Sequence, residues 1–245
     1  MPAVNQLISK KVAEFRRENG LSGTEPALLK SILLSNNVLT LFKPLSENFS
    51  GMAIKSGENR FIMVNSNHSI GKQHFTIAHE LYHLFKQPDF TNRFCSTGKF
   101  DRRGDINEYN ADLFAAELLL PEDGVFKLIP DVEMNKDKIQ LSTVINLEQY
   151  FYTSRSALLY RLKSLGLISG DRYDEFRVDI KRGAINHGFD TKLYERGNEG
   201  VVIGRYGQIA KELYDKEHIS ETFYTSLMMD IGKDVFLDLT DEPGQ

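Results

Sequence analysis

The chain has 245 residues, of which 41% are hydrophobic and 26% charged. This balance is ordinary for a folded globular protein with one large domain or two small ones, and it excludes a disordered or fibrous chain. The formal net charge is −4, and acidic residues outnumber basic ones in 171–245. That C-terminal part is therefore a poor candidate for binding the phosphate backbone of a nucleic acid.

Neither a membrane span nor secretion is indicated. The apolar runs are far shorter than the roughly 20 residues that a membrane-spanning helix needs. Residues 1–19 mix charged and apolar side chains and lack the continuous apolar stretch of a signal peptide. The single cysteine, Cys95, cannot form an internal disulfide, and no second thiol is present to complete a thiolate metal site. We therefore expect a cytoplasmic protein with no membrane partner.

The first third of the chain combines helix and strand patterns. Apolar residues at helical spacing predict a helix over 3–19, and Thr24 with Pro26 in the following turn predicts the start of a second helix. Three short runs rich in β-branched and aromatic residues then predict a small three-stranded sheet. These runs are 37–45, 50–57 and 60–67.

Helices predominate beyond the sheet. We expect helices at about 71–86 and 105–120, separated by a loop, with Pro121 ending the second. Two further helices, in 141–166, have helix-turn-helix spacing and Ser154 as a cap between them. Residues 171–245 are mostly of helical pattern, so the predicted fold class is α+β, mainly helical.

The most informative stretch lies on the helix predicted at 71–86. His79 and His83 are four residues apart, so both imidazoles emerge from one face of the helix and can share a metal ion. Glu80 lies about 100° further round, where its carboxylate can reach a water at the metal without displacing it. This is the His-Glu-x-x-His pattern of zinc peptidases, with Glu80 as the catalytic base.

A catalytic zinc needs three protein ligands and one open position. Glu108, on the next predicted helix, is the best candidate for the third ligand. Asp112 lies one turn further along the same face, where it can accept a hydrogen bond from the far nitrogen of a ligand histidine. We therefore expect one Zn²⁺ per chain as the cofactor.

Other side chains are weaker candidates for the site. His68, Tyr82 and Tyr109 are candidate cleft residues and guesses for the group that stabilises the oxyanion. His74 lies about 140° from His79 on the helix, so we expect a partly exposed histidine and not a ligand. Glu117 is a less favoured ligand than Glu108.

With the segments FSGMAI, HFTIAHELYHLF and EYNADLFAAELLLP, the sequence resembles the ImmA/IrrE family of bacterial metallopeptidases over about 50–168. The resemblance implies a gluzincin-like, zincin-like peptidase domain over 1–130 and a helix-turn-helix-like segment over 131–169. Residues 170–245 then form a helical region for substrate or partner recognition, which matches the family pattern weakly.

The resemblance also assigns roles to residues. It matches His79, His83 and Glu108 to the metal ligands and Glu80 to the catalytic glutamate, and it implies a helix-turn-helix repressor or antitoxin as the protein substrate. Tyr82 stands where the family more often has a small residue. The leading hypothesis is therefore a zinc-dependent endopeptidase that cleaves a cytoplasmic protein.

Two alternatives stay open. The helix pair at 141–166 carries Arg155, Arg161 and Lys163 on its second helix and would be the part that binds DNA. We favour instead that the pair packs on the peptidase domain, through Val144, Ile145, Leu147, Leu158, Leu159 and Leu162. The second alternative is a regulatory, stress-switch or toxin component whose metal site is structural or dormant, which the presence of Glu80 disfavours.

Overall fold

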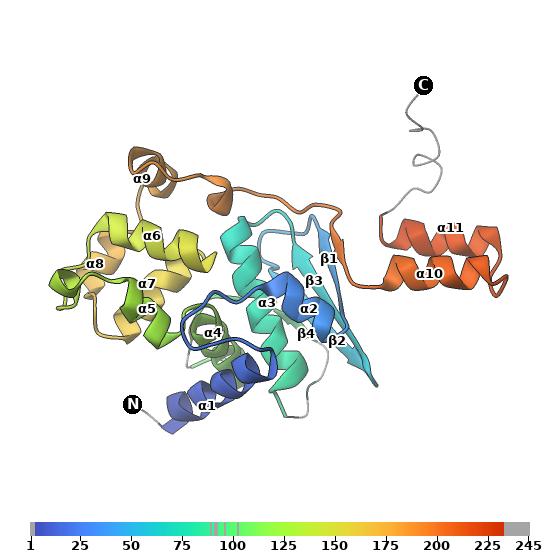
Figure 1. The fold of residues 1–245 in the computed structure, drawn as a ribbon, viewed down its shortest axis with the longest axis horizontal. Coiled ribbons are helices and arrows are strands. Elements are labelled where there is room, and N and C mark those ends of the chain that lie inside the picture. The colour runs from blue at the N-terminus through green and yellow to red at the C-terminus, as the bar shows by residue number, and fades with distance from the viewer. Residues whose placement is uncertain (1–2, 89, 91–92, 96, 102, 233–245) are drawn as a thin grey trace.

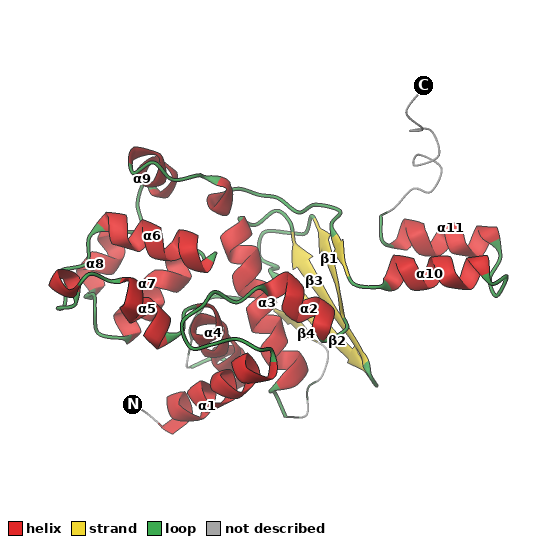
Figure 2. Ribbon diagram, viewed as in Figure 1, coloured by secondary structure: helices red, strands yellow, loops and turns green. Residues whose placement is uncertain are grey.

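The computed structural model describes residues 3–88, 90, 93–95, 97–101 and 103–232. Its elements form a mixed α+β fold in which helices predominate, as the sequence predicts (Figures 1 and 2). In chain order they are α1 (Ala3–Glu18), α2 (Leu29–Ser35), β1 (Val38–Lys43), β2 (Gly51–Ser56), β3 (Asn59–Asn65), α3 (Ile70–Phe85), β4 (Arg93–Cys95), α4 (Ile106–Leu119), α5 (Glu122–Leu128), α6 (Leu141–Phe151), α7 (Arg155–Ser164), α8 (Gly170–Glu175), α9 (Ile180–Asn186), β5 (Val202–Ile203), α10 (Tyr206–Asp215) and α11 (Glu221–Asp230), with single 3₁₀ turns at Asp131–Glu133 and Lys192–Tyr194.

The sheet of the described residues has five strands in the order β4-β2-β3-β1-β5. β1 runs parallel to β3, and the other pairs are antiparallel. The three predicted strands are confirmed as β1, β2 and β3, but the predicted number of strands is wrong. β4 has three residues and β5 only two, so neither is long enough to show the alternation that marks a strand in a sequence.

Helix α3 packs closely on the sheet. Ala53, Ile62 and Val64 are fully buried between them. A side chain at Gly51 on β2 would place its Cβ 2.6 Å from Thr76 Cγ2 on α3, so only glycine permits this approach. The contact brings the end of β2 next to the turn of α3 that carries the sequence motif.

Helix α4 is buried on nearly every side because α1, α3 and α7 surround it. Its small residues Ala111, Ala115 and Ala116 are at most 1% exposed and allow close approach of the neighbouring helices. Asp105 caps its N-terminus by accepting a 2.8 Å hydrogen bond from the Asn107 amide. The cap fixes where the first turn of α4 lies against α3.

The predicted start of the second helix at Thr24 is wrong. The buried guanidinium of Arg16 donates hydrogen bonds to the carbonyls of Ser22 and Glu25, each at 2.6 Å, and to the carbonyl of Leu118 at 2.6 Å. Carbonyls that satisfy this buried cation are not free to accept helical N–H groups. The stretch before α2 is therefore irregular.

The helices α6 and α7 pack on the rest of the fold, as predicted. The predicted packing face is fully buried: Val144, Ile145, Leu147, Leu158, Leu159 and Leu162 are each 0% exposed. The turn between the helices touches the start of α3, where a Cβ at Gly71 would lie 3.0 Å from the Ser154 backbone. Ser154 caps α7 through its hydroxyl, which accepts from the Ala157 amide.

Two of the three basic residues expected on the second helix are internal. Arg155 is 2% exposed and forms a bidentate pair with Glu148, with both N–O distances 2.6 Å. Arg161 is 7% exposed and lies 3.5 Å from Glu117. Both guanidinium groups neutralise buried carboxylates, so neither is available to a phosphate backbone.

After α9 the chain returns to the sheet as β5 and then leaves it for the helix pair α10–α11, which projects beyond the sheet (Figure 1). The turn into α10 passes through Gly204, whose φ of +133° favours glycine. The helical expectation for 171–245 is thus confirmed for most of the described part, and 233–245 lie outside the described residues. Among the described residues, no helix combines the length and apolar character needed to cross a membrane.

The buried pair of Glu148 and Arg155 predicts a stability effect. Replacing Arg155 with Met leaves Glu148 as an uncompensated charge at 0% exposure, and we expect the free energy of unfolding to fall by about 3–5 kcal/mol. Urea denaturation measures it. Arg177→Met is the control, because Arg177 is 55% exposed beside Asp174 and its loss should cost under about 1 kcal/mol. Equal losses in the two variants would contradict the prediction.

Candidate metal centre

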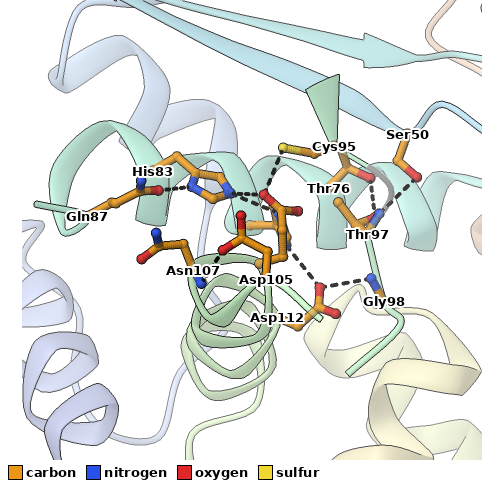
Figure 3. A network of polar contacts seen from close by, with 12 residues as sticks. Ser50, Thr76, His83, Gln87, Cys95, Thr97, Gly98, Asp105, Asn107 and Asp112 are labelled. Carbon is orange, nitrogen blue, oxygen red and sulfur yellow. Dashed lines mark hydrogen bonds and ion pairs between the residues drawn. The ribbon is translucent and has the colours of Figure 1, made fainter. Parts of the chain in front are cut away.

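Helices α3 and α4 bring three side chains of the sequence motif together. His79 and His83 project from one face of α3, with their Nε2 atoms 3.0 Å apart. Glu108 in the first turn of α4 places Oε2 at 3.3 Å from His79 Nε2 and Oε1 at 3.4 Å from His83 Nε2. Figure 3 shows the His83 ring projecting from α3, with Gln87 on one side of it. The three side chains therefore surround one point.

The hydrogen bonds of the two imidazoles settle which nitrogens carry protons. His79 Nδ1 lies 2.9 Å from Asp112 Oδ1, and His83 Nδ1 contacts Gln87 Oε1. Both partners are acceptors, so each Nδ1 is the protonated nitrogen and each Nε2 presents a lone pair. With both imidazoles neutral, two lone pairs and the Glu108 carboxylate then face one another. Such a group repels itself unless a cation lies at its centre.

The spacing of these atoms fits a metal ion. Nitrogen and oxygen ligands at about 2.0–2.2 Å from one tetrahedral zinc ion lie about 3.3–3.5 Å from each other. The two distances from the histidines to Glu108, 3.3 and 3.4 Å, lie in this range, and the 3.0 Å between the histidine nitrogens is slightly shorter. The donor set of two histidines and a glutamate is that of catalytic zinc sites such as those of the His₂Glu peptidases.

The pKa values favour the forms of these residues that bind metal. Burial and the neighbouring His79 lower the pKa of His83 to about 4, so its imidazole is neutral at physiological pH. Although burial by itself raises the pKa of Glu108, its contact with His79 lowers that pKa below its ordinary value. Neutral imidazole and ionised carboxylate are the ligating forms.

The pKa of His79 also indicates that the surrounding acceptors favour a positive charge at this place. Burial by itself lowers its pKa, but contacts with Asp112, Cys95 and Glu108 outweigh burial and hold the pKa well above its ordinary value. A proton on this imidazole would supply the positive charge that the surrounding acceptors require. A metal ion at the same place satisfies that requirement for all of them together.

Asp112 connects the centre to the segment before α4. Its Oδ1 accepts from His79 Nδ1 and from the Gly98 amide, at 2.9 and 2.8 Å, and its Oδ2 accepts from the Phe100 amide at 2.8 Å. Figure 3 shows Asp112 beside Gly98. The carboxylate therefore orients one imidazole and holds the 98–100 backbone over the same site.

Glu80 lies beside the group without belonging to it. It is 0% exposed, and neither of its carboxylate oxygens has a hydrogen-bond partner among the described residues. Burial raises its pKa to about 7. A buried carboxyl group without partners is costly, and a pKa shifted this far marks Glu80 as a candidate functional residue.

Cys95 is a member of the cluster that the sequence analysis did not assign. The possible ligand atoms of His79, His83, Cys95 and Glu108 all lie within 4.8 Å of one another. Cys95 was set aside because no second thiol is present, but its partners are imidazoles and a carboxylate. The local sequence contains no signal for this placement, since it depends on how β4 pairs with β2.

Two candidate histidines lie elsewhere. The His68 ring contacts the Glu47 carbonyl at 3.1 Å and Lys72 Nζ at 3.3 Å, and His68 is not part of the cluster. His74 is partly exposed and contacts the Tyr152 carbonyl at 2.7 Å, in the turn between α6 and α7. His74 therefore joins two parts of the fold, in agreement with the expectation that it is no ligand.

The two tyrosines expected near a cleft are buried. Tyr82 is 1% exposed, with its ring centre 5.6 Å from that of Phe114 and 5.3 Å from Lys11 Nζ. Tyr109 is 6% exposed and belongs to the same hydrophobic core. Both rings pack in the core, and the Tyr82 ring centre lies 5.7 Å from that of His83, so a place for them beside the site stays a prediction.

Comparison of the sequence with models of protein families shows to which family the region around this centre belongs. A profile of the IrrE N-terminal-like domain, Peptidase_M78, matches residues 35–163. The chain belongs to this family. Membership in Peptidase_M78 indicates a metallopeptidase, and the matched region runs from the end of α2 to α7 and includes every residue of the cluster. No curated protein matches the chain.

The position of Asp112 predicts its effect on metal binding. Asp112→Ala removes the acceptor that orients His79 and releases two amides of the 98–100 segment, so metal affinity should fall about 10–100-fold. Competition with a chelator measures the affinity. Asp101→Ala is the control, because the exposed Asp101 accepts a local bond from the Arg103 amide in the same loop. Equal affinities in the two variants would remove Asp112 from the centre.

Proposed function

We propose that this member of the IrrE N-terminal-like family is a zinc-dependent endopeptidase with His79, His83 and Glu108 as metal ligands and Glu80 as the catalytic base. One observation carries the proposal: a buried carboxyl group without partners stands beside converging lone pairs that require a cation. A zinc ion bound there supplies Lewis-acid activation of water and of the scissile carbonyl.

Glu80 performs the proton transfers. Its carboxylate accepts the proton of the attacking water and returns it to the nitrogen of the leaving amine as the peptide bond breaks. A base is most effective when its pKa lies near the working pH, and burial raises the pKa of Glu80 to about 7. The low-polarity surroundings thus prepare Glu80 for both steps.

The remaining polar groups hold the ligands in place. Asp112 and Gln87 accept from the Nδ1–H groups of His79 and His83, which keeps both Nε2 atoms unprotonated and correctly aimed. Asp112 also fixes the backbone at Gly98, next to the site. These contacts reduce the reorganisation needed when substrate binds.

A cavity lined by Gly98 and Phe100, whose amides Asp112 holds, supports a protein substrate. It has a volume of about 410 Å³ and lies between the start of α3, the 97–100 segment and the start of α7. Phe75, Phe100 and Leu193 form apolar walls, and Lys72 and Lys181 contribute positive charge. We infer that it receives a side chain of the substrate.

The identity of the substrate rests on the resemblance to the ImmA/IrrE family alone. We propose a cytoplasmic helix-turn-helix repressor or antitoxin. We also propose that residues 1–130 form the zincin-like, gluzincin-type peptidase domain and that 131–169 are a helix-turn-helix-like part packed on it. Burial of Arg155 and Arg161 disfavours the alternative that this part binds DNA. Residues 170–245 remain proposed for substrate or partner recognition.

The ligand assignment predicts the metal content of two variants. His79→Ala and His83→Ala each remove one of three proposed ligands, so neither should retain one zinc ion per chain after purification. Elemental analysis of the purified proteins measures this. His74→Ala, on the same helix but outside the cluster, is the matched control and should keep its zinc. Full zinc occupancy in both ligand variants would refute the assignment.

The role of Glu80 predicts a separation of binding from catalysis. Glu80→Gln keeps the side-chain shape and all proposed ligands, but an amide cannot accept the proton. Zinc content should be unchanged, while hydrolysis of a labelled unfolded protein such as casein should fall by about 10²–10⁴-fold.

The matched control for Glu80→Gln is Glu117→Gln. Burial also raises the pKa of Glu117, but it lies on α4 beside Arg161. Glu117→Gln should leave the rate of casein hydrolysis close to that of the wild type. Undiminished hydrolysis by Glu80→Gln would make the protein a binding component with a structural or dormant metal site.

A further inference from the structure

The cluster contains a fourth donor of the kind that zinc prefers. Cys95 is 3% exposed, and its Sγ lies 3.6 Å from Glu108 Oε1. Its sulfur and the ligand atoms of His79, His83 and Glu108 all lie within 4.8 Å of one another. Figure 3 shows the Cys95 side chain reaching into the same group of polar contacts as His83 and Asp112.

The sulfur distance is that expected between two ligands of one ion. A sulfur at about 2.3 Å and an oxygen at about 2.1 Å from a tetrahedral zinc ion are separated by about 3.6 Å. With Cys95 included, the chain supplies four donors, which equals the full coordination number of tetrahedral zinc.

The backbone holds the thiol in this place. Cys95 pairs with Gly51 across the β4–β2 ladder, and its carbonyl accepts from the Ser50 amide at 3.1 Å. The next described residue, Thr97, donates its amide to Ser50 Oγ at 3.3 Å and lies 3.2 Å from the Thr76 hydroxyl. Contacts to both β2 and α3 therefore fix the strand end, so the thiol does not reach the cluster by chance rotation of a loop.

A metal site with four protein ligands and a site with a catalytic base have different requirements, and one fixed arrangement does not meet both. A structural zinc site is closed by four ligands and has no use for Glu80, whose two oxygens are buried without partners. A catalytic site needs Glu80 but also an open position for water and substrate. The two requirements are met together if the fourth ligand leaves before catalysis.

We propose that the Cys95 thiolate is a fourth ligand of the metal and keeps the peptidase latent, so that activity requires its withdrawal. This proposal rests on the proposed function. Withdrawal has to break the contacts just described but no others in the sheet, because β4 is an edge strand of three residues that pairs with β2 alone among the described strands. The opened position would then face the water and the substrate carbonyl, with Glu80 beside it.

The test uses the full chain with cobalt in place of zinc, because cobalt reports thiolate ligation by a near-ultraviolet charge-transfer absorption. We expect this band in the wild-type protein and its loss in Cys95→Ser at one cobalt per chain. Zinc affinity of Cys95→Ser, measured by chelator competition, should fall by at least about 10-fold. Hydrolysis of labelled casein by the zinc-loaded protein should instead rise.

Ser50→Ala is the matched control for the variant. It removes a hydroxyl that holds the Thr97 amide at the same strand end and leaves the thiol in place, so the charge-transfer band should persist. The wild-type spectrum needs no variant and keeps the test decisive if Cys95→Ser folds poorly. Absence of the band from the wild-type protein at one cobalt per chain would overturn the proposal.

The remaining outcomes distinguish failure of the proposed Cys95 ligation from failure of the proposed peptidase activity. Hydrolysis that depends on Glu80 but is equal in the wild type and Cys95→Ser would overturn latency while the peptidase stands. If Cys95→Ser shows no hydrolysis that depends on Glu80, the peptidase assignment fails, and the proposed inhibition by Cys95 fails with it.

Discussion

The structure depends on a group of acceptors that face one another across the contact between α3 and α4. His79 Nε2, His83 Nε2 and the Glu108 carboxylate lie within 3.4 Å of their nearest neighbours, and their protons are directed away from the centre to Asp112 and Gln87. Without a cation this arrangement is repulsive. The surrounding fold therefore has to hold α3 and α4 together against that repulsion, and it does so by burying most residues of both helices.

The sheet contributes both rigidity and a further donor. Because Gly51 lets β2 lie directly on α3, the end of the β4–β2 ladder reaches the cluster and places Cys95 beside it. The start of α7 lines the cavity that Gly98 and Phe100 share, and Arg155 there neutralises Glu148 of α6. The family match covers α6 and nearly all of α7 as well as the metal centre.

Much of the fold follows from local patterns. The strands β1 to β3, the helices α3 and α4, and the Ser154 cap were all predictable, since periodicity and capping involve residues close in sequence. The start of α2 was not, because Arg16 draws the Ser22 and Glu25 carbonyls into a bond network that includes the distant Leu118. The strands β4 and β5 exist only by pairing with partners far along the chain.

The same distinction divides the site. The sequence by itself determined that His79 and His83 share a helix face with Glu80 between them, because an i, i+4 spacing has one geometry in any α-helix. Only the tertiary structure decided that Tyr82 is buried in the hydrophobic core and that Cys95 joins the cluster. Their positions depend on how helices pack and how a three-residue strand registers on its neighbour, and these contacts between distant segments leave no periodic trace in the sequence.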